Sequence, residues 1–368
     1  MLDRETELRT DLFSGRQVLI AEGRAARPQQ TGRPELTIDE QTDPFLEGHE
    51  SETPSERLAL RLHDSAANEG GWLLRVVPNR YPAVRQSAGK SVGSTSNDAV
   101  GLHDVVIECP DARTSLLQFS VAEIARVLKA WQLRVTALMS EPGIRHVSVF
   151  RNEGARAGAS LPHAHSQILA TGFLPAAVTL RRQREQQSLQ DTGATLLDRW
   201  LQQEQLDGRR IVRQNQDLLI SCPDAPQVAW HTRISPLSDP VQSFVLLEET
   251  QILQLATNLR RTLCALADLL GSYSCNLLLH LPPAEAMLQQ AGLQANSWPW
   301  MLDIVPRTSG IAGYELMTDV DIVTVSPETA RAKLRERIDC SDTVGDAEID
   351  EANSTDGNVL CPPGYGWR

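Results

Sequence analysis

The chain has 368 residues, of which 41% are hydrophobic and 22% are charged, and this composition is ordinary for a soluble globular protein. Its net charge of -12 disfavours nucleic acid or an anionic membrane as the main partner, because both select clustered cations. No apolar run approaches the roughly 20 residues that span a bilayer, no secretory signal is visible, and the six cysteines are scattered, so we expect a reduced, cytoplasmic protein.

The first long helix is predicted over residues 121–138. Ser120 precedes it and Glu123 follows three residues later, which is the pattern of a capping box. Apolar side chains recur at intervals of three and four residues and would form one face of the helix: Val121, Ile124, Leu128, Trp131, Val135 and Leu138. We expect this face to pack against the core.

The most informative segment follows a β-rich run at residues 146–152. It reads Gly158-Ala-Ser-Leu-Pro-His163-Ala-His165-Ser-Gln167-Ile-Leu-Ala170. Residues two apart in an extended strand face the same side, so His163, His165 and Gln167 would line up. Imidazole is substantially unprotonated near neutral pH, so this row could attack a phosphorus atom or hold a metal.

A second helix is predicted over residues 252–270, with Gly271 at its C-terminal cap. Its apolar face would consist of Ile252, Leu255, Leu259, Leu263, Leu266 and Leu270. Strand-like segments follow at 275–280 and 300–307. The order helix, strand, loop, strand therefore occurs twice, about 130 residues apart, which indicates a duplicated unit.

The second copy of this unit lacks the histidine row. When Ile168 is laid on Ile304, Gln167 falls on Asp303, His165 on Met301 and His163 on Pro299. Because only one of the two corresponding strands carries the histidines, we predict one chemical site per chain, supplied mainly by the first half.

Further motifs occur in a fixed order around the histidine row. They are Arg24-Ala-Ala-Arg27-Pro, Asp43-Pro-Phe-Leu-Glu-Gly48, Val77-Pro-Asn79-Arg-Tyr-Pro, His103-Asp-Val-Val-Ile-Glu-Cys-Pro-Asp111, Phe150-Arg-Asn152-Glu-Gly154 with Ser160, and Gly313-Tyr314-Glu315. Together with the row, they resemble the galactose-1-phosphate uridylyltransferase family and the related sugar-nucleotide phosphorylases of the histidine triad superfamily. The resemblance runs from about Arg16 to Arg335.

The resemblance implies a double displacement. His165 would attack the α-phosphorus of a nucleoside-diphosphate sugar and form a nucleotidyl-histidine, and a sugar phosphate or inorganic phosphate would then accept the nucleotide. Gln167 would donate its amide N–H to a phosphoryl oxygen, and His163 would support the strand beside them. The resemblance also assigns substrate contacts to Arg24, Arg27, Asn79, Asn152, Ser160, Gly313, Tyr314 and Glu315.

The metal sites of the family are mostly replaced in this sequence. The four positions of its structural zinc site read Asp43, Leu46, Ala112 and His163, and one imidazole cannot close a tetrahedral site. Glu47 and His49 could join Asp43 and His163 in an improvised site, although charged loop residues are usually only solvated. The second metal site reads Arg181, His280, Pro299 and Met301. We therefore predict no metal site and no required cofactor.

The predicted fold is α+β, with two histidine-triad-like halves related by duplication, each an antiparallel sheet with a long packed helix. We expect an N-terminal domain at 1–175 with the catalytic strand, and a C-terminal domain at 176–336. Residues 339–356 carry seven acidic residues and no Lys or Arg, so 337–368 is predicted to be a flexible acidic tail.

Three functions remain open. The first is a nucleotidyltransferase of the UDP-glucose:hexose-1-phosphate uridylyltransferase type, which acts on a nucleoside-diphosphate sugar and a sugar 1-phosphate in galactose metabolism. For this function we expect a homodimer, and no nucleic acid or membrane as a partner. The second is an ADP-glucose-type phosphorylase. The third is a catalytically retired sugar-nucleotide-binding protein, suggested by the lost metal ligands and opposed by the intact His165 and Gln167.

Overall fold

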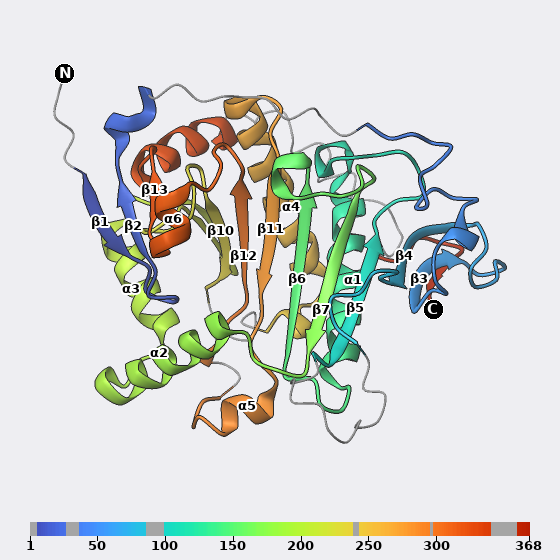
Figure 1. The fold of residues 1–368 in the computed structure, drawn as a ribbon, viewed down its shortest axis with the longest axis horizontal. Coiled ribbons are helices and arrows are strands. Elements are labelled where there is room, and N and C mark those ends of the chain that lie inside the picture. Colours follow the sequence, from blue (N-terminus) through green and yellow to red (C-terminus); the bar gives the residue numbers. More distant parts are fainter. Residues whose placement is uncertain (1–5, 27–36, 86–98, 238–242, 295–296, 340–358) are drawn as a thin grey trace.

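The computed structural model describes residues 6–26, 37–85, 99–237, 243–294, 297–339 and 359–368 (Figure 1). The predicted substrate contact Arg27 and residues 340–358 of the predicted tail lie outside these ranges. The fold is α+β and contains two sheets, one of three strands and one of eleven. This architecture confirms the predicted α+β class with a large antiparallel sheet.

The large sheet is antiparallel throughout, with strand order β14-β3-β4-β5-β7-β6-β11-β12-β10-β9-β8. Its strands in chain order are β3 (Leu58–Leu62), β4 (Trp72–Pro78), β5 (Gly101–Ile107), β6 (His146–Glu153), β7 (His165–Thr171), β8 (Ile211–Gln214), β9 (Leu218–Ser221), β10 (Thr232–Pro236), β11 (Cys275–His280), β12 (Met301–Pro306) and β14 (Tyr365–Trp367). The β6–β11 pair joins the strands of the first half of the sequence to those of the second half. Outward from it, β7, β5, β4 and β3 on one side correspond to β12, β10, β9 and β8 on the other.

Two long helices, α1 (Val121–Met139) and α4 (Glu249–Leu270), lie side by side behind the large sheet (Figure 1). The six apolar positions predicted for α1 are all buried, and the predicted capping box of Ser120 and Glu123 is present. Gly271 ends α4 with a φ of +69°, which glycine adopts without a Cβ penalty. The Trp131 indole N–H donates to Ser166 Oγ at 2.7 Å and fixes α1 against β7.

The other helices are shorter or lie at the edges of the sheet. They are α2 (Ala176–Thr192), α3 (Leu196–Asp207), α5 (Glu285–Gln289), α6 (Gly313–Thr318) and a helix over residues 327–339, with 3-10 turns η1 (Glu22–Ala26), η2 (Glu50–Glu52), η3 (Leu116–Gln118), η4 (Ala155–Ala157) and η5 (Phe244–Leu246). No helix among the described residues is long and apolar enough to cross a membrane.

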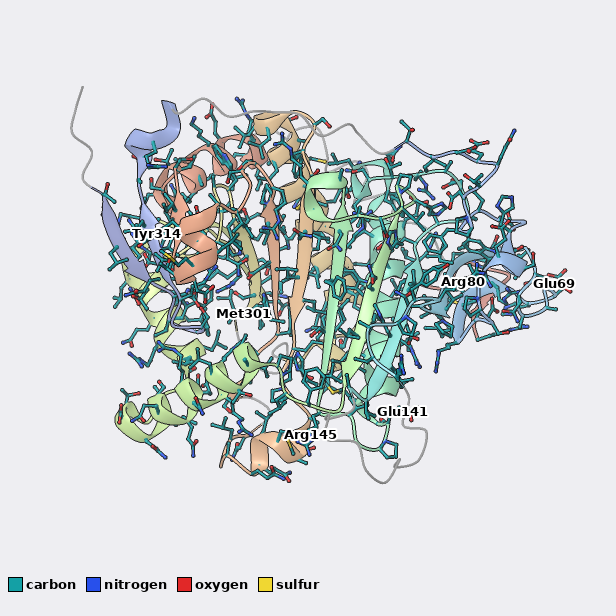
Figure 2. All side chains as sticks on the ribbon, in the orientation of Figure 1. Glu69, Arg80, Glu141, Arg145, Met301 and Tyr314 are labelled. Atoms are coloured by element: carbon teal, nitrogen blue, oxygen red, sulfur yellow. The ribbon has the colours of Figure 1, made fainter. Side chains whose placement is uncertain are left out.

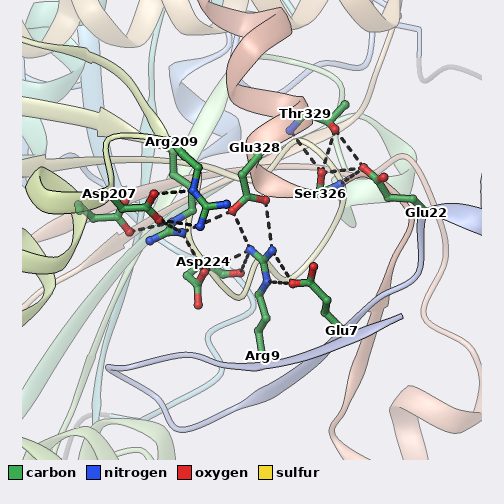
Figure 3. Close-up of polar contacts among 11 residues, drawn as sticks. Glu7, Arg9, Glu22, Asp207, Arg209, Asp224, Ser326, Glu328 and Thr329 are labelled. Carbon is green, nitrogen blue, oxygen red and sulfur yellow. Dashed lines mark hydrogen bonds and ion pairs between the residues drawn. The ribbon is translucent and has the colours of Figure 1, made fainter. Parts of the chain in front are cut away.

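The small sheet joins the beginning of the chain to its late segments. It contains β1 (Glu7–Thr10), β2 (Gln17–Ile20) and β13 (Asp321–Val323), with β2 in the centre. The Arg9 guanidinium on β1 contacts the carboxylates of Glu7, Asp224 and Glu328 (Figure 3). Because Glu328 lies on the helix at 327–339, this network holds the N-terminal hairpin against the C-terminal half.

The prediction of a flexible tail is wrong for its last residues. Residues 365–367 form β14, which pairs antiparallel with β3 through the register Tyr365 to Leu62 and Trp367 to Leu60. The Leu360 side chain is 1% exposed and belongs to the main hydrophobic core. The acidic composition of residues 339–356 does not extend to this segment, whose apolar side chains and edge-strand hydrogen bonds attach it to the sheet.

This attachment predicts a stability effect. Replacing Leu360 by Ala removes a buried side chain, so we expect the free energy of unfolding to fall by about 2–5 kcal/mol. The control is Leu206→Ala, because Leu206 is 82% exposed on α3 and should change stability by less than about 0.5 kcal/mol. Urea denaturation followed by circular dichroism measures both variants. Equal stabilities would show that the C-terminal segment does not pack as described.

Candidate active site

His165 is the first residue of β7 and lies on the face of the sheet opposite to α1. His163 lies in the bend before the strand, so the prediction of one strand face for the whole row holds only for His165 and Gln167. Ser166 points to α1, as its bond to Trp131 shows, so His165 and Gln167 point to the other face. That face of β4, β5 and β7 is covered by the segment at residues 37–56. The Phe45 ring packs there at 5.4 Å from the His165 ring and 5.8 Å from the His163 ring, measured between centroids.

His165 has a defined proton arrangement. Its Nδ1 lies 2.7 Å from the carbonyl oxygen of His163, and because a carbonyl can only accept, Nδ1 carries the proton. In the neutral ring, Nε2 therefore has a free lone pair. Burial lowers the pKa of His165, and the positive charge of Arg151 acts in the same direction, against the opposing effects of the His163 carbonyl and Glu108. A neutral imidazole with a directed Nε2 is suited to nucleophilic attack.

Gln167 is oriented by a residue whose role the sequence did not reveal. His103 Nδ1 accepts the Ala83 N–H at 3.2 Å, so its Nε2 carries the proton and donates to Gln167 Oε1 at 2.9 Å. This bond leaves the Gln167 amide N–H groups available for another acceptor. Burial lowers the pKa of His103, against the opposing effects of Gln167 and Asp104, and so favours its neutral form. In the sequence, His103 was only the first residue of one of the motifs that resemble the family.

Two predicted substrate contacts lie beside these residues. The Asn79 backbone N–H donates to the His103 carbonyl at 2.8 Å, which places Asn79 next to the His103–Gln167 pair. Asn152 lies on β6, the neighbour of β7, and its Oδ1 accepts from Asn276 Nδ2 at 2.8 Å. Asn276 also donates to the Ala157 carbonyl at 2.9 Å and so ties the loop before β7 to β11.

Ser160 lies exposed in the loop that leads into β7, between η4 and the histidine row. This loop turns at Gly154 and Gly158, whose φ values are +80° and +85°. A Cβ at Gly154 would lie 2.4 Å from Ser274 Oγ, so glycine is required there for space as well as for conformation. The Ser160 hydroxyl is therefore presented by a tight loop rather than by a strand.

Four other predicted substrate contacts, all within the described residues, do not lie near His165 within one chain. Arg24 is exposed on η1, next to the small sheet, and Gly313, Tyr314 and Glu315 lie on α6 beside β13. Figure 1 shows these elements on the opposite side of the molecule from β7, with β6, β11 and β12 in between. Figure 2 shows the same separation between Tyr314 and Arg80, the neighbour of Asn79. A single-chain site containing all predicted residues is therefore not observed.

His163 is held by two acceptors. Its Nδ1 lies 2.7 Å from Asp43 Oδ2, and its Nε2 lies 3.0 Å from the Cys109 carbonyl oxygen. Both His163 and Asp43 are buried. Burial raises the pKa of Asp43, but the hydrogen bonds from His163 and the Phe45 N–H outweigh this effect and lower it. The pair therefore contains an ionised carboxylate.

Of the four positions of the second metal site that the resemblance implies, His280 contacts a buried ion pair of Arg233 and Asp303, and Arg181 lies over the Trp298 ring. Arg181 lies with its guanidinium carbon 4.4 Å from the Trp298 ring centroid, and burial lowers its pKa to about 10. His280 Nε2 lies 3.0 Å from Asp303 Oδ2, and Arg233 bonds both oxygens of Asp303 at 2.7 and 2.9 Å. Within the described ranges, no group of three or more His, Cys, Asp or Glu side chains could hold a metal ion.

Comparison with known proteins shows which family the chain resembles. The family model of the galactose-1-phosphate uridyl transferase N-terminal domain matches residues 2–175. The N-terminal part of the chain therefore matches the galactose-1-phosphate uridylyltransferase family. The family match and the curated relatives show that the protein is a nucleotidyltransferase-type enzyme.

Three relatives illustrate the match. The chain is 29% identical to ADP-glucose phosphorylase of Arabidopsis thaliana over 91% of this chain and 93% of that protein. It is 26% identical to galactose-1-phosphate uridylyltransferase of Rattus norvegicus over 70% of this chain and 66% of that one. A crystal structure of an Arabidopsis ADP-glucose phosphorylase with bound ADP-glucose superposes with a TM-score of 0.75 at 27% identity, covering 90% of this chain and 99% of that chain.

The site geometry predicts how its two histidines titrate. Because burial disfavours the imidazolium, His165 and His103 should both become protonated only below pH 6.5, the ordinary value for histidine. The unfolded chain would take up these protons first, so the folded state should lose stability as the pH falls below 6.5. Nuclear magnetic resonance of isotope-labelled imidazoles, assigned with His165→Gln and His103→Leu, measures the midpoints. A midpoint at or above 6.5 for either ring would contradict this environment.

Proposed function

We propose that this enzyme transfers a nucleotide from a nucleoside-diphosphate sugar through a covalent intermediate on His165, with ADP-glucose as donor and inorganic phosphate as acceptor. The observation that carries the proposal is the hydrogen bond from His165 Nδ1 to the His163 carbonyl, which leaves Nε2 as the nucleophile. The products would be glucose 1-phosphate and ADP.

The bond changes balance in two steps. In the first step, Nε2 of His165 attacks the α-phosphorus, a P–N bond forms, and the P–O bond to glucose 1-phosphate breaks. In the second step, a phosphate oxygen attacks the same phosphorus, the P–N bond breaks, and the neutral imidazole is restored as ADP leaves. Dividing the transfer into two displacements lets one nucleophile serve both, and no general base is needed because the attacking nitrogen is already deprotonated.

Hydrogen-bond donors next to Nε2 would stabilise the charge that builds on the phosphorus centre. Gln167, fixed through Oε1 by His103, would present its amide N–H to a non-bridging oxygen. Asn152, fixed through Oδ1 by Asn276, would do the same from β6. Ser160 and Asn79 would hold the remainder of the nucleotide. Pre-oriented donors of this kind do not have to reorganise when the charge develops.

The choice of base and acceptor rests on coverage of the relatives. The Arabidopsis ADP-glucose phosphorylase matches 91% of this chain, against 70% for the rat uridylyltransferase at lower identity. Transfer of UMP between hexose 1-phosphates is the competing function, because the N-terminal family model and several curated relatives carry that name. The two functions share the His165 chemistry and differ in the base and in the acceptor.

Arg24 and the segment at 313–315 suggest a homodimer. If these residues contact the substrate as the resemblance implies, they must come from a second copy of the chain, because α6 and η1 lie across the molecule from β7 (Figure 1). Exposed apolar side chains on and before α6 favour such an interface, among them Ile311, Leu316 and Met317.

The mirrored strand order around β6 and β11 supports an origin of the fold by duplication, with domains at 1–175 and 176–336.

The reaction predicts covalent labelling of His165. Incubation with ADP-glucose carrying a radiolabel in the α-phosphate should yield acid-labile label on the protein, and addition of inorganic phosphate should release it as ADP. UDP-glucose should label more slowly. The His165→Gly variant should take up no label because it lacks the nucleophile, although circular dichroism should show it folded.

The outcome of this experiment separates the candidate functions. Label from UDP-glucose that is released by galactose 1-phosphate but not by phosphate would favour the uridylyltransferase. Absence of label from either donor would leave only a sugar-nucleotide-binding protein and would refute both enzyme functions.

The proposed orientation of Gln167 predicts a selective effect of His103→Leu. Without the bond to Oε1, the amide can rotate away from the phosphate, so we expect the rate of nucleotidylation to fall about tenfold to a hundredfold. The affinity for the donor, measured by calorimetry, should change by less than about threefold. The control is His63→Leu, because His63 is exposed at the end of β3. A large loss of affinity with an unchanged rate would contradict the orienting role.

A further inference from the structure

The zinc site that the family resemblance implies does not fit the residues present. Leu46 and Ala112 occupy two of its four positions and have no ligand atom. At the other two positions, Asp43 Oδ2 and His163 Nδ1 lie 2.7 Å apart, at hydrogen-bond distance, so each uses its ligand atom on the other. A single carboxylate bonded to a single imidazole is not a tetrahedral zinc site.

The neighbouring polar side chains do not complete the set. His49 Nδ1 lies 2.6 Å from the Asp43 backbone oxygen, and Glu47 Oε1 accepts the Gly71 N–H. The Cys109 sulfur lies 3.6 Å from His163 Nε2, on the opposite edge of the ring from Asp43, so one ion could not bind both. The improvised site of Asp43, Glu47, His49 and His163 is therefore not formed in this structure.

We propose that the Asp43–His163 hydrogen bond takes over the positioning role of the missing zinc site and fixes the nucleophile through the His163 backbone. This inference rests on the proposed function of His165. Asp43 acts as a positioning residue, since it touches neither His165 nor the reacting atoms.

The connection from Asp43 to the nucleophile is short and buried. The Asp43 carboxylate binds one edge of the His163 ring, and the Cys109 carbonyl binds the other edge at 3.0 Å. A ring held at both edges limits the freedom of its own backbone, and the carbonyl of that residue accepts the His165 Nδ1–H at 2.7 Å. The His163 and Asp43 side chains are 0% and 5% exposed, so water competes little for these bonds.

The segment that carries Asp43 is itself anchored. Asp43 Oδ1 accepts the Phe45 N–H at 3.0 Å, and the Phe45 ring contacts both imidazoles edge-on. Asp43 therefore orients the ring that covers His165 as well as the ring that precedes it. Loss of the carboxylate would remove both the contact that orients His163 and the contact that orients Phe45, and His165 depends on both residues for its position.

The test compares carboxylate-to-carboxamide variants on the same segment. Asp43→Asn removes the charge from the His163 contact, and Asp43→Ala removes the acceptor. Glu50→Gln is the matched control, because Glu50 is also buried and accepts the Trp72 indole N–H at 2.7 Å without touching either histidine. Folding of each variant is checked by urea denaturation.

Three measurements are made on the full chain. Single-turnover labelling by ADP-glucose should slow about tenfold or more in Asp43→Asn and further in Asp43→Ala, with donor affinity within about threefold and Glu50→Gln close to wild type. Imidazole nuclear magnetic resonance should show only the Nδ1–H tautomer of His165 in the wild type and a mixture of tautomers in Asp43→Ala. Mass-spectrometric metal analysis should find no stoichiometric zinc, and a chelator should leave the labelling rate unchanged.

Several results would overturn the inference. Stoichiometric zinc whose removal abolishes labelling would show that a metal, not Asp43, fixes the site. Labelling of Asp43→Ala at the wild-type rate with an unchanged His165 tautomer would show that Asp43 has no positioning role. If the wild type forms no nucleotidyl-enzyme at all, the proposed function fails, while the tautomer of His165 in Asp43→Ala still decides whether Asp43 positions the ring.

Discussion

The hydrogen bond between His165 Nδ1 and the carbonyl of His163 is the interaction on which the candidate site depends. It fixes which nitrogen carries the proton, and so which nitrogen has the free lone pair. It also fixes the direction of that lone pair, because the bond spans only two residues at the start of β7. A ring held only by packing could rotate, and a nucleophile displaced by about 1 Å loses much of its rate.

The surroundings of this bond explain why it sits in the middle of a large sheet. β7 pairs with β5 over residues 165–171 on one side and with β6 over residues 166–171 on the other. On one face Ser166 is tied to Trp131 of α1, and on the other Phe45 covers the histidines. The sheet supplies rigidity, and the two neighbouring strands supply His103, which orients Gln167, and Asn152.

The strands of the second half of the chain carry a buried ion-pair cluster in place of a histidine row. Asp303 on β12 faces Arg233 on β10, in the arrangement in which Gln167 faces Val105 on β5. His231 and His280 also lie at 3.3 and 3.0 Å from Asp303. Burying these charges has a desolvation cost that only close pairing offsets, so the cluster is a specific structural contact rather than a large source of stability. In both halves, a residue at a position where the resemblance implied a metal ligand instead contacts a buried carboxylate: His163 contacts Asp43, and His280 contacts Asp303.

The sequence alone determined the elements whose signals are local. The periodic apolar residues predicted α1 and α4, because helical periodicity is set by backbone geometry. The alternation of His163, His165 and Gln167 predicted a strand with one polar face, and this is correct for His165 and Gln167, whereas His163 lies in the bend before β7. Composition was less reliable at the C-terminus, where the acidic stretch suggested a free tail and the last residues pair with β3.

Only the tertiary structure decided which residues meet. His103 lies 64 residues before Gln167, and Asp43 lies 120 residues before His163, so strand register and loop docking bring each pair together. The same register places Arg24 and the segment at 313–315 away from His165, although their motifs resemble those of one site. Local patterns specify the conformation and face of a residue, whereas its partner depends on how distant segments pack.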